Sequence, residues 1–110
     1  MKLYGLKTCD TCRKALKDLK DAGVEVAFVD VRADGVPERD LARFLTAFGE
    51  NLINRRSTTW RGLDEAARAA APLALLQAHP TLMKRPVIEA GDRLFLGWTA
   101  QTRAALLADG

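Results

Sequence analysis

The chain is poor in residues that bind metals and in apolar runs that cross membranes. Its 110 residues include two cysteines and one histidine, His79. A structural zinc site takes four ligands, so these residues would need a second copy of the chain to complete one. No apolar stretch approaches the ~20 residues of a membrane span, and the start MKLYGLK is not an export signal. We therefore expect no metal, no membrane anchor, and a cytoplasmic location where a lasting structural disulfide is unfavourable.

The chain also lacks a block of charge of one sign. It has 17 Lys and Arg residues against 14 Asp and Glu residues, for a net charge of +3. Because the basic residues are scattered, direct nucleic-acid binding is not expected, and a small anionic substrate suits the surplus better. The length fits one compact domain with a single core.

The first third of the chain predicts two strands joined by a helix. Residues 2–6 form the first expected strand. From Cys12 onward, apolar residues recur at the spacing of one helix face, and Gly23 is placed to end that helix. Residues 24–31 are rich in β-branched side chains and predict a buried strand. The β–α–β unit of residues 2–31 should therefore have parallel strands and a right-handed crossover.

The middle of the chain, about residues 37–80, predicts helices. Pro37 is placed to open the first of them. Residues 50–62 are polar and predict irregular structure. Residues 63–78 are rich in Ala and Leu and predict helix, with Pro72 either splitting it or opening a second helix.

The last third returns to strands. Residues 86–90 and 93–97 flank a tight turn around Gly91, which is an antiparallel hairpin signal. Thr99 can then cap a closing helix that runs through Leu107.

These segments together predict an α/β protein with a thioredoxin-like fold and a four-stranded mixed sheet. The expected single domain, residues 1–110, has a β–α–β half (2–31), an all-helical insertion (about 37–80) and a β–β–α half (about 84–108). A CxxC motif at the first strand-to-helix turn is part of this arrangement.

Cys9 and Cys12 lie at that first turn, where a thiolate is favoured. At a helix N-cap, the free backbone N–H groups and the helix dipole stabilise an anion, so we expect a lowered pKa for Cys9. Cys12 lies one turn further, on the apolar face, and the two sulfurs can come within bonding distance. We predict that Cys9 attacks and Cys12 resolves the intermediate. The alternatives are half of a metal site or two ordinary core cysteines.

Two basic segments are candidates for anion binding. Arg85 and Pro86 precede the third expected strand, a place that faces the cysteine turn in a thioredoxin-like fold. A cis bond there would expose backbone to a substrate, and Arg85 would supply a fixed cation beside the thiolate. The alternative is a surface arginine beside an ordinary strand-starting proline. Arg55, Arg56 and Arg61 lie in the polar middle stretch, where they can either rim an anion site or form a solvated loop.

Three stretches resemble the arsenate reductase (ArsC) family of thioredoxin-like proteins: LYGLKTCDTCRKAL, NRRSTTWRGLDE and KRPVIEAGDRLFLGW. The likeness is greatest to the YffB-type reductase-like subgroup, with the Spx-type regulators as a second branch. It implies a thiol-dependent oxidoreductase that draws electrons from glutathione or glutaredoxin and holds no tightly bound cofactor.

The resemblance assigns roles to individual residues. It implies that Cys9 is the nucleophile and that Arg85 is the arginine before the motif proline, Pro86. Arg56 matches an arginine of the subgroup's loop motif. With the reasoning above, we predict the catalytic residues Cys9, Cys12 and Arg85, and the substrate-binding residues Thr11, Arg13, Arg56 and Pro86.

The chain departs from true arsenate reductases at several positions. It has Asn54 near one expected arginine, no arginine after the fourth strand, and Lys7-Thr8 in place of Asn-Pro before the cysteine. We therefore expect glutathione or a glutathionylated partner, rather than arsenate, to be the substrate. The stretch CDTCRK instead resembles the Spx-type regulators, which implies the alternative of a redox switch that binds RNA polymerase.

Overall fold

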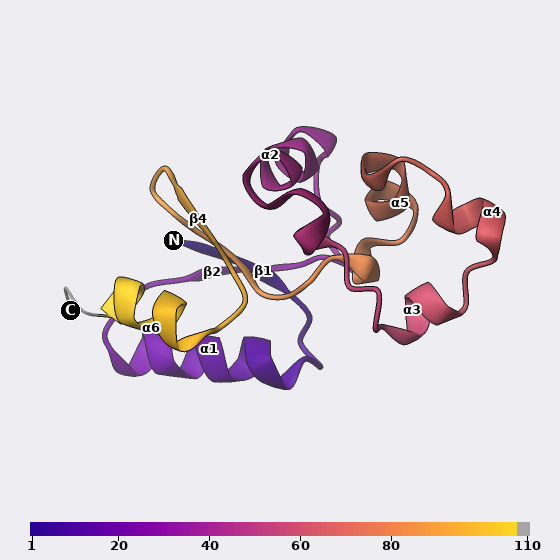
Figure 1. Cartoon of the computed structure of the whole chain (residues 1–110). Helices are drawn as coiled ribbons and strands as arrows, with labels where there is room; N and C mark the ends of the chain where they lie inside the picture. Colours follow the sequence, from indigo (N-terminus) through magenta and orange to yellow (C-terminus); the bar gives the residue numbers. More distant parts are fainter. Residues whose placement is uncertain (108–110) are drawn as a thin grey trace. The chain divides into compact units, whose positions relative to one another are not determined.

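The computed structural model describes residues 1–107, in two compact units (Figure 1). The first unit joins Met1–Asp30 to the segment from Arg85 onward, and the second is Val31–Lys84. Among the described residues, none of the helices is long and apolar enough to cross a membrane. The assignment of the whole chain to a single domain stays a prediction.

The first unit contains a mixed sheet of four strands in the order β2-β1-β3-β4. β1 pairs parallel with β2 and antiparallel with β3, and β3 pairs antiparallel with β4. The strands are β1 (Lys2–Gly5), β2 (Ala27–Asp30), β3 (Val87–Ala90) and β4 (Arg93–Leu96). The predicted α/β class, sheet composition and strand directions are confirmed.

Helices α1 (Asp10–Asp21) and α6 (Ala100–Leu107) lie on the same side of this sheet (Figure 1). The cross-strand pair Leu3 and Ile88 points toward α1, where Cys12, Ala15 and Leu19 are fully buried. Partly buried Phe95, Trp98 and Leu106 pack against this cluster from β4 and α6. The cluster is the core that holds the start of α1 against the end of β1.

The ends of these elements agree with the sequence signals at several places. Gly23, with a φ of 80°, follows α1, and its N–H donates to the Lys20 carbonyl at 2.9 Å. Gly91, with a φ of 63°, forms the turn between β3 and β4. Both glycines have backbone angles that other residues rarely adopt. The Thr99 hydroxyl accepts from the Thr102 N–H at 3.0 Å, as expected for a cap of α6.

The expectation of a buried strand over residues 24–31 is wrong in extent. β2 covers Ala27–Asp30 only, and Phe28 and Val29 are partly exposed. The cause is the position of β2 at the edge of the sheet, where a strand has a neighbour on one side alone.

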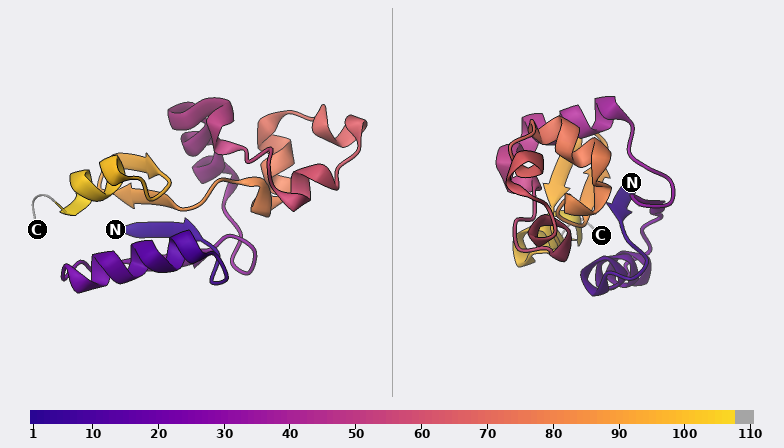
Figure 2. Two further views of the ribbon diagram at one scale, coloured as in Figure 1. Left: turned by 60° about the horizontal axis from the view of Figure 1, so that its bottom comes forward. Right: turned by 90° about the vertical axis from the view of Figure 1, so that its right-hand side faces the viewer.

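The second unit is helical, as predicted for the insertion. Figure 2 shows its short segments following one another from α2, in purple, to η2, in orange. They are α2 (Glu38–Phe48), η1 (Gly49–Leu52), α3 (Thr58–Arg61), α4 (Glu65–Arg68), α5 (Pro72–Ala78) and η2 (Pro80–Leu82). Their core includes the buried side chains of Leu41, Phe44, Leu52, Leu75, Leu76, Leu82 and Met83.

Two details of the insertion refine the sequence expectation. Pro72 opens the separate helix α5, so the second of the two alternatives is correct. The stretch 50–62 is not wholly irregular, because α3 forms within it. Ser57 caps α3 by accepting from the Trp60 N–H at 3.1 Å, which stabilises a helix too short for a periodic signal.

Candidate active site

Cys9 is the N-cap residue of α1, directly after the loop that follows β1. Its extended backbone has a φ of −84° and a ψ of 119°. Its N–H donates to the Leu6 carbonyl at 3.1 Å, and its carbonyl accepts from the Arg13 N–H at 3.0 Å. The loop of residues 6–9, here called the cysteine loop, is thus closed by a hydrogen bond between its ends and joined to the first turn of α1. Both cysteines are free thiols, Cys9 partly buried and Cys12 buried.

Cys12 is fully buried because Gly5 makes room for it. A Cβ atom added at Gly5 would overlap the Cys12 Sγ atom. Gly5 has no left-handed backbone angle, so this close approach, rather than conformation, requires glycine. Sequence reasoning missed Gly5; the signal was a glycine at the end of a strand just before a CxxC motif.

The pKa of Cys9 lies below its ordinary value. Partial burial by itself raises the pKa, but four interactions with Cys12 and Arg85 together outweigh it. The backbone N–H of Cys12, the Cys12 thiol, and the hydrogen bond and positive charge of Arg85 all favour the thiolate. Cys12 and Arg85 therefore lower the pKa of Cys9, in the direction expected from its place at the helix start.

The pKa of Cys12 moves in the opposite direction, to about 12. Burial is the largest cause, and the adjacent Cys9 adds to it, because a charge on Cys12 would be both desolvated and close to a second anion. The pKa values of the two sulfurs are thus shifted in opposite directions, and Cys9 loses its proton at a lower pH than Cys12 does. Cys9 is therefore the more readily ionised of the two sulfurs, and the Cys12 thiol donates a hydrogen bond to it.

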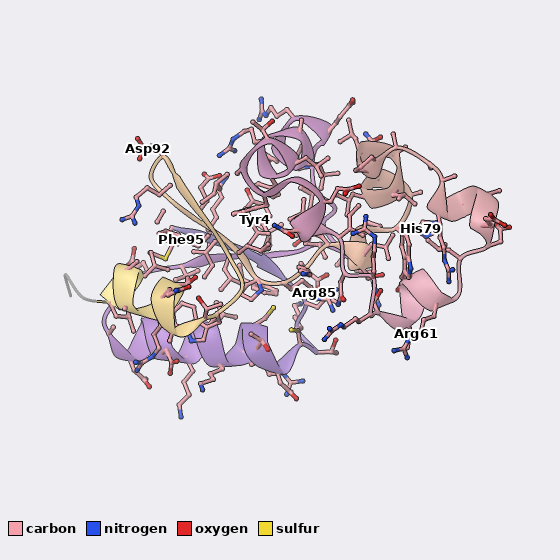
Figure 3. All side chains as sticks on the ribbon, viewed as in Figure 1. Tyr4, Arg61, His79, Arg85, Asp92 and Phe95 are labelled. Carbon is pink, nitrogen blue, oxygen red and sulfur yellow. The ribbon has the colours of Figure 1, made fainter. Side chains whose placement is uncertain are left out.

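Arg85 and Pro86 belong to the same unit as the cysteines. The Arg85–Pro86 peptide bond is cis. Pro86 is buried, and its carbonyl accepts from the Gly97 N–H at 2.7 Å, which ties it to the end of β4. Figure 3 draws the Arg85 side chain, which hydrogen-bonds to Cys9. The structure therefore brings Cys9, Cys12 and Arg85 together.

The predicted substrate-binding residues are placed differently from one another. Thr11 is exposed on the first turn of α1. Arg13 is exposed, and its Nε donates to the Lys7 carbonyl at 2.8 Å, so it also holds the cysteine loop. Arg56 is exposed in the second unit, where its N–H donates to the Asn54 Oδ1 atom at 3.1 Å. Their binding roles stay predictions.

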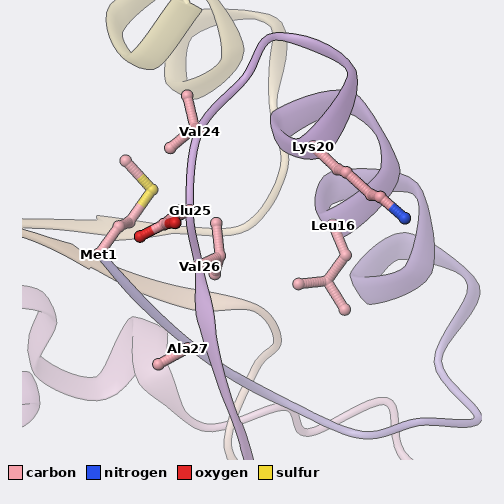
Figure 4. Close-up of a pocket in the computed structure, with 7 residues that line it drawn as sticks. All are labelled: Met1, Leu16, Lys20, Val24, Glu25, Val26 and Ala27. Atoms are coloured by element: carbon pink, nitrogen blue, oxygen red, sulfur yellow. The ribbon is translucent and has the colours of Figure 1, made fainter.

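A hollow of about 690 Å³ elsewhere in the first unit includes none of these residues (Figure 4). Apolar side chains from Met1, Leu16 and Val26 line it, with Lys20 and Glu25 among them. Across residues 1–107 there is also no group of three or more His, Cys, Asp or Glu side chains that could hold a metal ion.

A four-stranded mixed sheet, with a cysteine at the start of α1 and a buried proline before β3, defines a thioredoxin-like protein. Comparison with known sequences gives the family directly. The chain matches the ArsC family over residues 4–106, and it belongs to that family.

Individual relatives agree with this assignment. An uncharacterized protein of Haemophilus influenzae is 40% identical over 111 residues, covering 96% of this chain and 97% of its own length. A solved structure named YffB protein is 38% identical, with a TM-score of 0.89. The match covers 96% of this chain and 97% of that chain. The structure of an arsenate reductase (ArsC) related protein from Brucella melitensis is 38% identical, with a TM-score of 0.73. The match covers 94% of this chain and 91% of that chain. The predicted family and its thioredoxin-like fold are confirmed.

Proposed function

We propose that the protein is a cytoplasmic thiol-dependent oxidoreductase in which the Cys9 thiolate attacks an oxidised sulfur of a disulfide substrate. The observation that carries the proposal is the lowered pKa of Cys9 at the start of α1, beside Arg85. A thiolate, rather than a thiol, is the nucleophile in such exchange reactions. Membership of the ArsC family supports this class of chemistry.

The first step transfers one half of the substrate disulfide to the protein. The Cys9 thiolate attacks one sulfur, a new bond forms between that sulfur and Cys9, and the other half leaves as a thiolate. The positive charge of Arg85 stabilises negative charge on the sulfurs during this exchange. Thr11, Arg13, Arg56 and Pro86 are proposed to bind the substrate.

The second step releases the bound half and has two candidate thiols. Cys12 can give up its proton and attack the Cys9 sulfur, which forms a Cys9–Cys12 disulfide and frees the substrate thiolate. Two glutathione thiols, or the dithiol of glutaredoxin, then supply the two electrons that restore both cysteines. Alternatively, glutathione attacks the mixed disulfide itself. Burial of Cys12 and its pKa of about 12 favour the external thiol.

Glutathione or a glutathionylated partner is the proposed substrate class, with glutathione as co-substrate and no tightly bound cofactor. The departures at Asn54 and Lys7-Thr8, together with the lack of an arginine after β4, argue against arsenate itself. The proposal needs a small anionic substrate, which suits the positive charge of Arg85.

Incubation with glutathione disulfide tests these roles. Wild type, Cys9→Ser and Cys12→Ser are compared by intact mass, with urea-unfolded protein as the control for reagent quality. We expect a stable mixed disulfide in Cys12→Ser and none in Cys9→Ser. The absence of an adduct from every folded form, combined with capture of RNA polymerase by the wild type, would overturn the reductase proposal.

That last result would favour the second candidate, a Spx-type redox switch. The observation in its favour is the stretch CDTCRK, with two free thiols three positions apart. In this case the Cys9–Cys12 disulfide would change the binding of a transcription partner instead of completing a catalytic cycle.

A further inference from the structure

The second unit has a hollow of about 490 Å³ whose lining is mainly polar. Three cations, one carboxylate and two side-chain amides contribute to it: Arg55, Arg56, Lys84, Glu50, Asn51 and Asn54. All six lie within Val31–Lys84, so the hollow is built by one unit.

The fold brings these residues together from two distant segments of the chain. Ile53 and Met83 form an isolated antiparallel bridge, and both are almost fully buried. The Lys84 N–H donates to the Leu52 carbonyl at 2.7 Å, and the Asn54 N–H donates to the Leu82 carbonyl at 2.8 Å. These bonds bring Asn54 and Lys84 close to each other; Lys84 is exposed and Asn54 is partly exposed beside the buried bridge.

Asn54 also fixes the turn that carries the two arginines. Its Oδ1 atom accepts from the Arg56 N–H at 3.1 Å, and its carbonyl accepts from the Ser57 hydroxyl at 2.9 Å. A side-chain amide that bonds to the backbone two residues ahead holds a local turn. Arg55 is further ordered because its guanidinium lies over the Trp60 ring, 5.5 Å from the centroid.

The hollow carries more positive charge than its own carboxylate neutralises. Glu50 faces Arg55 at 3.5 Å, and both side chains are well exposed. In the described part of the chain, no carboxylate forms a salt bridge with Arg56 or Lys84. Two cations are therefore left to face solvent beside a preformed concave surface, an arrangement that favours an anion.

We propose that this hollow binds a phosphate group, either as free phosphate or as a small phosphate monoester. The planar guanidinium of Arg56 can meet two phosphate oxygens at once, and Lys84 supplies a compact second charge. A phosphate group carries close to two negative charges at neutral pH, which matches the two cations better than a single carboxylate does. Arg56 is also a proposed substrate-binding residue of the Cys9 reaction, whereas Lys84 has no part in that reaction, so Lys84 is the residue that separates the two proposals.

The test follows backbone and side-chain NMR signals of the full-length, labelled protein during titration with inorganic phosphate at low ionic strength. Sodium chloride at matched ionic strength is the control for general screening. We expect saturable shifts at Arg56 and Lys84. Lys84→Gln and Arg56→Gln should each weaken the binding by about tenfold, as expected when a charge-assisted hydrogen bond is lost.

Arg61→Gln is the matched control, because Arg61 is exposed at the end of α3, five residues after Arg56, but is not among the residues that line the hollow. It removes the same charge and should change phosphate affinity little. Equal weakening by all three variants, or no saturable shift at Arg56 or Lys84 of the wild type, would overturn the proposal. If one lining variant fails to fold, as judged from its own NMR spectrum, the other still gives the comparison.

A second titration, with glycerol phosphate, distinguishes the two sources of the group. Tighter binding than inorganic phosphate identifies a monoester as the ligand, and equal or weaker binding identifies free phosphate. Malonate, a small dicarboxylate, is the comparator: binding as tight as phosphate would contradict the phosphate assignment. Lys84→Gln should leave mixed-disulfide formation at Cys9 unchanged, so failure of this proposal and failure of the oxidoreductase proposal are distinguishable.

Discussion

The starts of α1 and α6 satisfy their backbone N–H groups in different ways. At α6, the Thr99 hydroxyl accepts from the Thr102 N–H at 3.0 Å. At α1, the N-cap residue is Cys9, and no side-chain capping hydrogen bond forms. The Cys12 N–H instead lowers the pKa of Cys9. Equivalent backbone N–H groups at the two helix starts therefore have different partners: a hydroxyl that caps the helix at α6, and a sulfur whose thiolate form they stabilise at α1.

This difference follows from the acceptor. A neutral thiol is a weak hydrogen-bond acceptor, so Cys9 contributes little to helix stability while it is protonated. Once it is ionised, the sulfur can use the N–H groups and the positive end of the helix dipole. Cys9 therefore caps α1 less well than a threonine caps α6, and the N–H groups at the start of α1 favour its thiolate instead.

Cys9→Ser should have the largest effect, because it places a hydroxyl at the start of α1 and so makes that helix start resemble the start of α6. We expect complete loss of the mixed disulfide with glutathione, because the nucleophile is gone. A serine oxygen is a good helix cap, so the free energy of unfolding at acid pH should rise by up to about 1 kcal/mol. Mass spectrometry and urea unfolding measure the two effects. A variant that still forms the adduct, or that is less stable at acid pH, would contradict this account.

The stability difference should also depend on pH, since the pKa of Cys9 is lowered in the folded state. Above the pKa of the unfolded cysteine, the thiolate contributes its full stabilisation. This contribution is lost as the pH falls through the lower pKa of the folded protein. The advantage of Cys9→Ser should therefore be greatest at acid pH and shrink as the pH rises.

Gly5→Ala should disturb the α1 start without touching Cys9. The added methyl group would overlap the Cys12 Sγ atom, so we expect a loss of about 1–3 kcal/mol in the free energy of unfolding and a higher pKa of Cys9. Gly62→Ala is the control, because its Cβ would make only ordinary contacts, the nearest 3.5 Å from the Thr58 carbonyl. In a Cys12→Ala background the cost of Gly5→Ala should fall; an unchanged cost would place the strain elsewhere.

Arg85→Gln should weaken the second source of thiolate stabilisation. Removal of its positive charge raises the pKa of Cys9, so a smaller fraction of Cys9 is ionised at low pH. At a pH below the Cys9 pKa of both proteins, the variant should form the adduct about tenfold more slowly than wild type. Rates measured across a pH series check the cause, because the difference from wild type should narrow as the pH rises. A difference that is the same at every pH would instead indicate a role in substrate binding.

Thr99→Ala has the smallest expected effect and tests the other side of the comparison. Loss of the α6 cap should cost about 1 kcal/mol in the free energy of unfolding and leave the pKa of Cys9 unchanged. Urea unfolding and the rate of adduct formation measure the two quantities. A slower Cys9 reaction in this variant would show that the α6 cap also supports the α1 site.

The features predictable from sequence are those set by local patterns. The apolar spacing after Cys12 predicts α1, Gly23 and Gly91 mark a helix end and a turn, and Thr99 precedes a helix as a capping residue does. The place of Cys9 at the start of α1 follows from the same pattern. These signals depend on residues a few positions apart, which is why they can be read without the fold.

The features that could not be predicted depend on contacts between distant segments. Gly5 is required by the position of the Cys12 sulfur, and the shortness of β2 follows from its place at the sheet edge. Lys84 joins Arg56 at one hollow only because the Ile53–Met83 bridge aligns two segments far apart in the chain. No local pattern encodes such pairings.

The most direct test of the central claim is the pKa of Cys9 in the folded protein, measured from the ultraviolet absorbance of its thiolate. Cys12, with a pKa of about 12, stays protonated over the relevant range, and Cys9→Ser supplies the blank. The same titration in urea gives the unfolded reference. A folded midpoint below the unfolded one is the predicted result; a folded midpoint equal to or above it would contradict the role of the α1 start and Arg85 in forming the nucleophile.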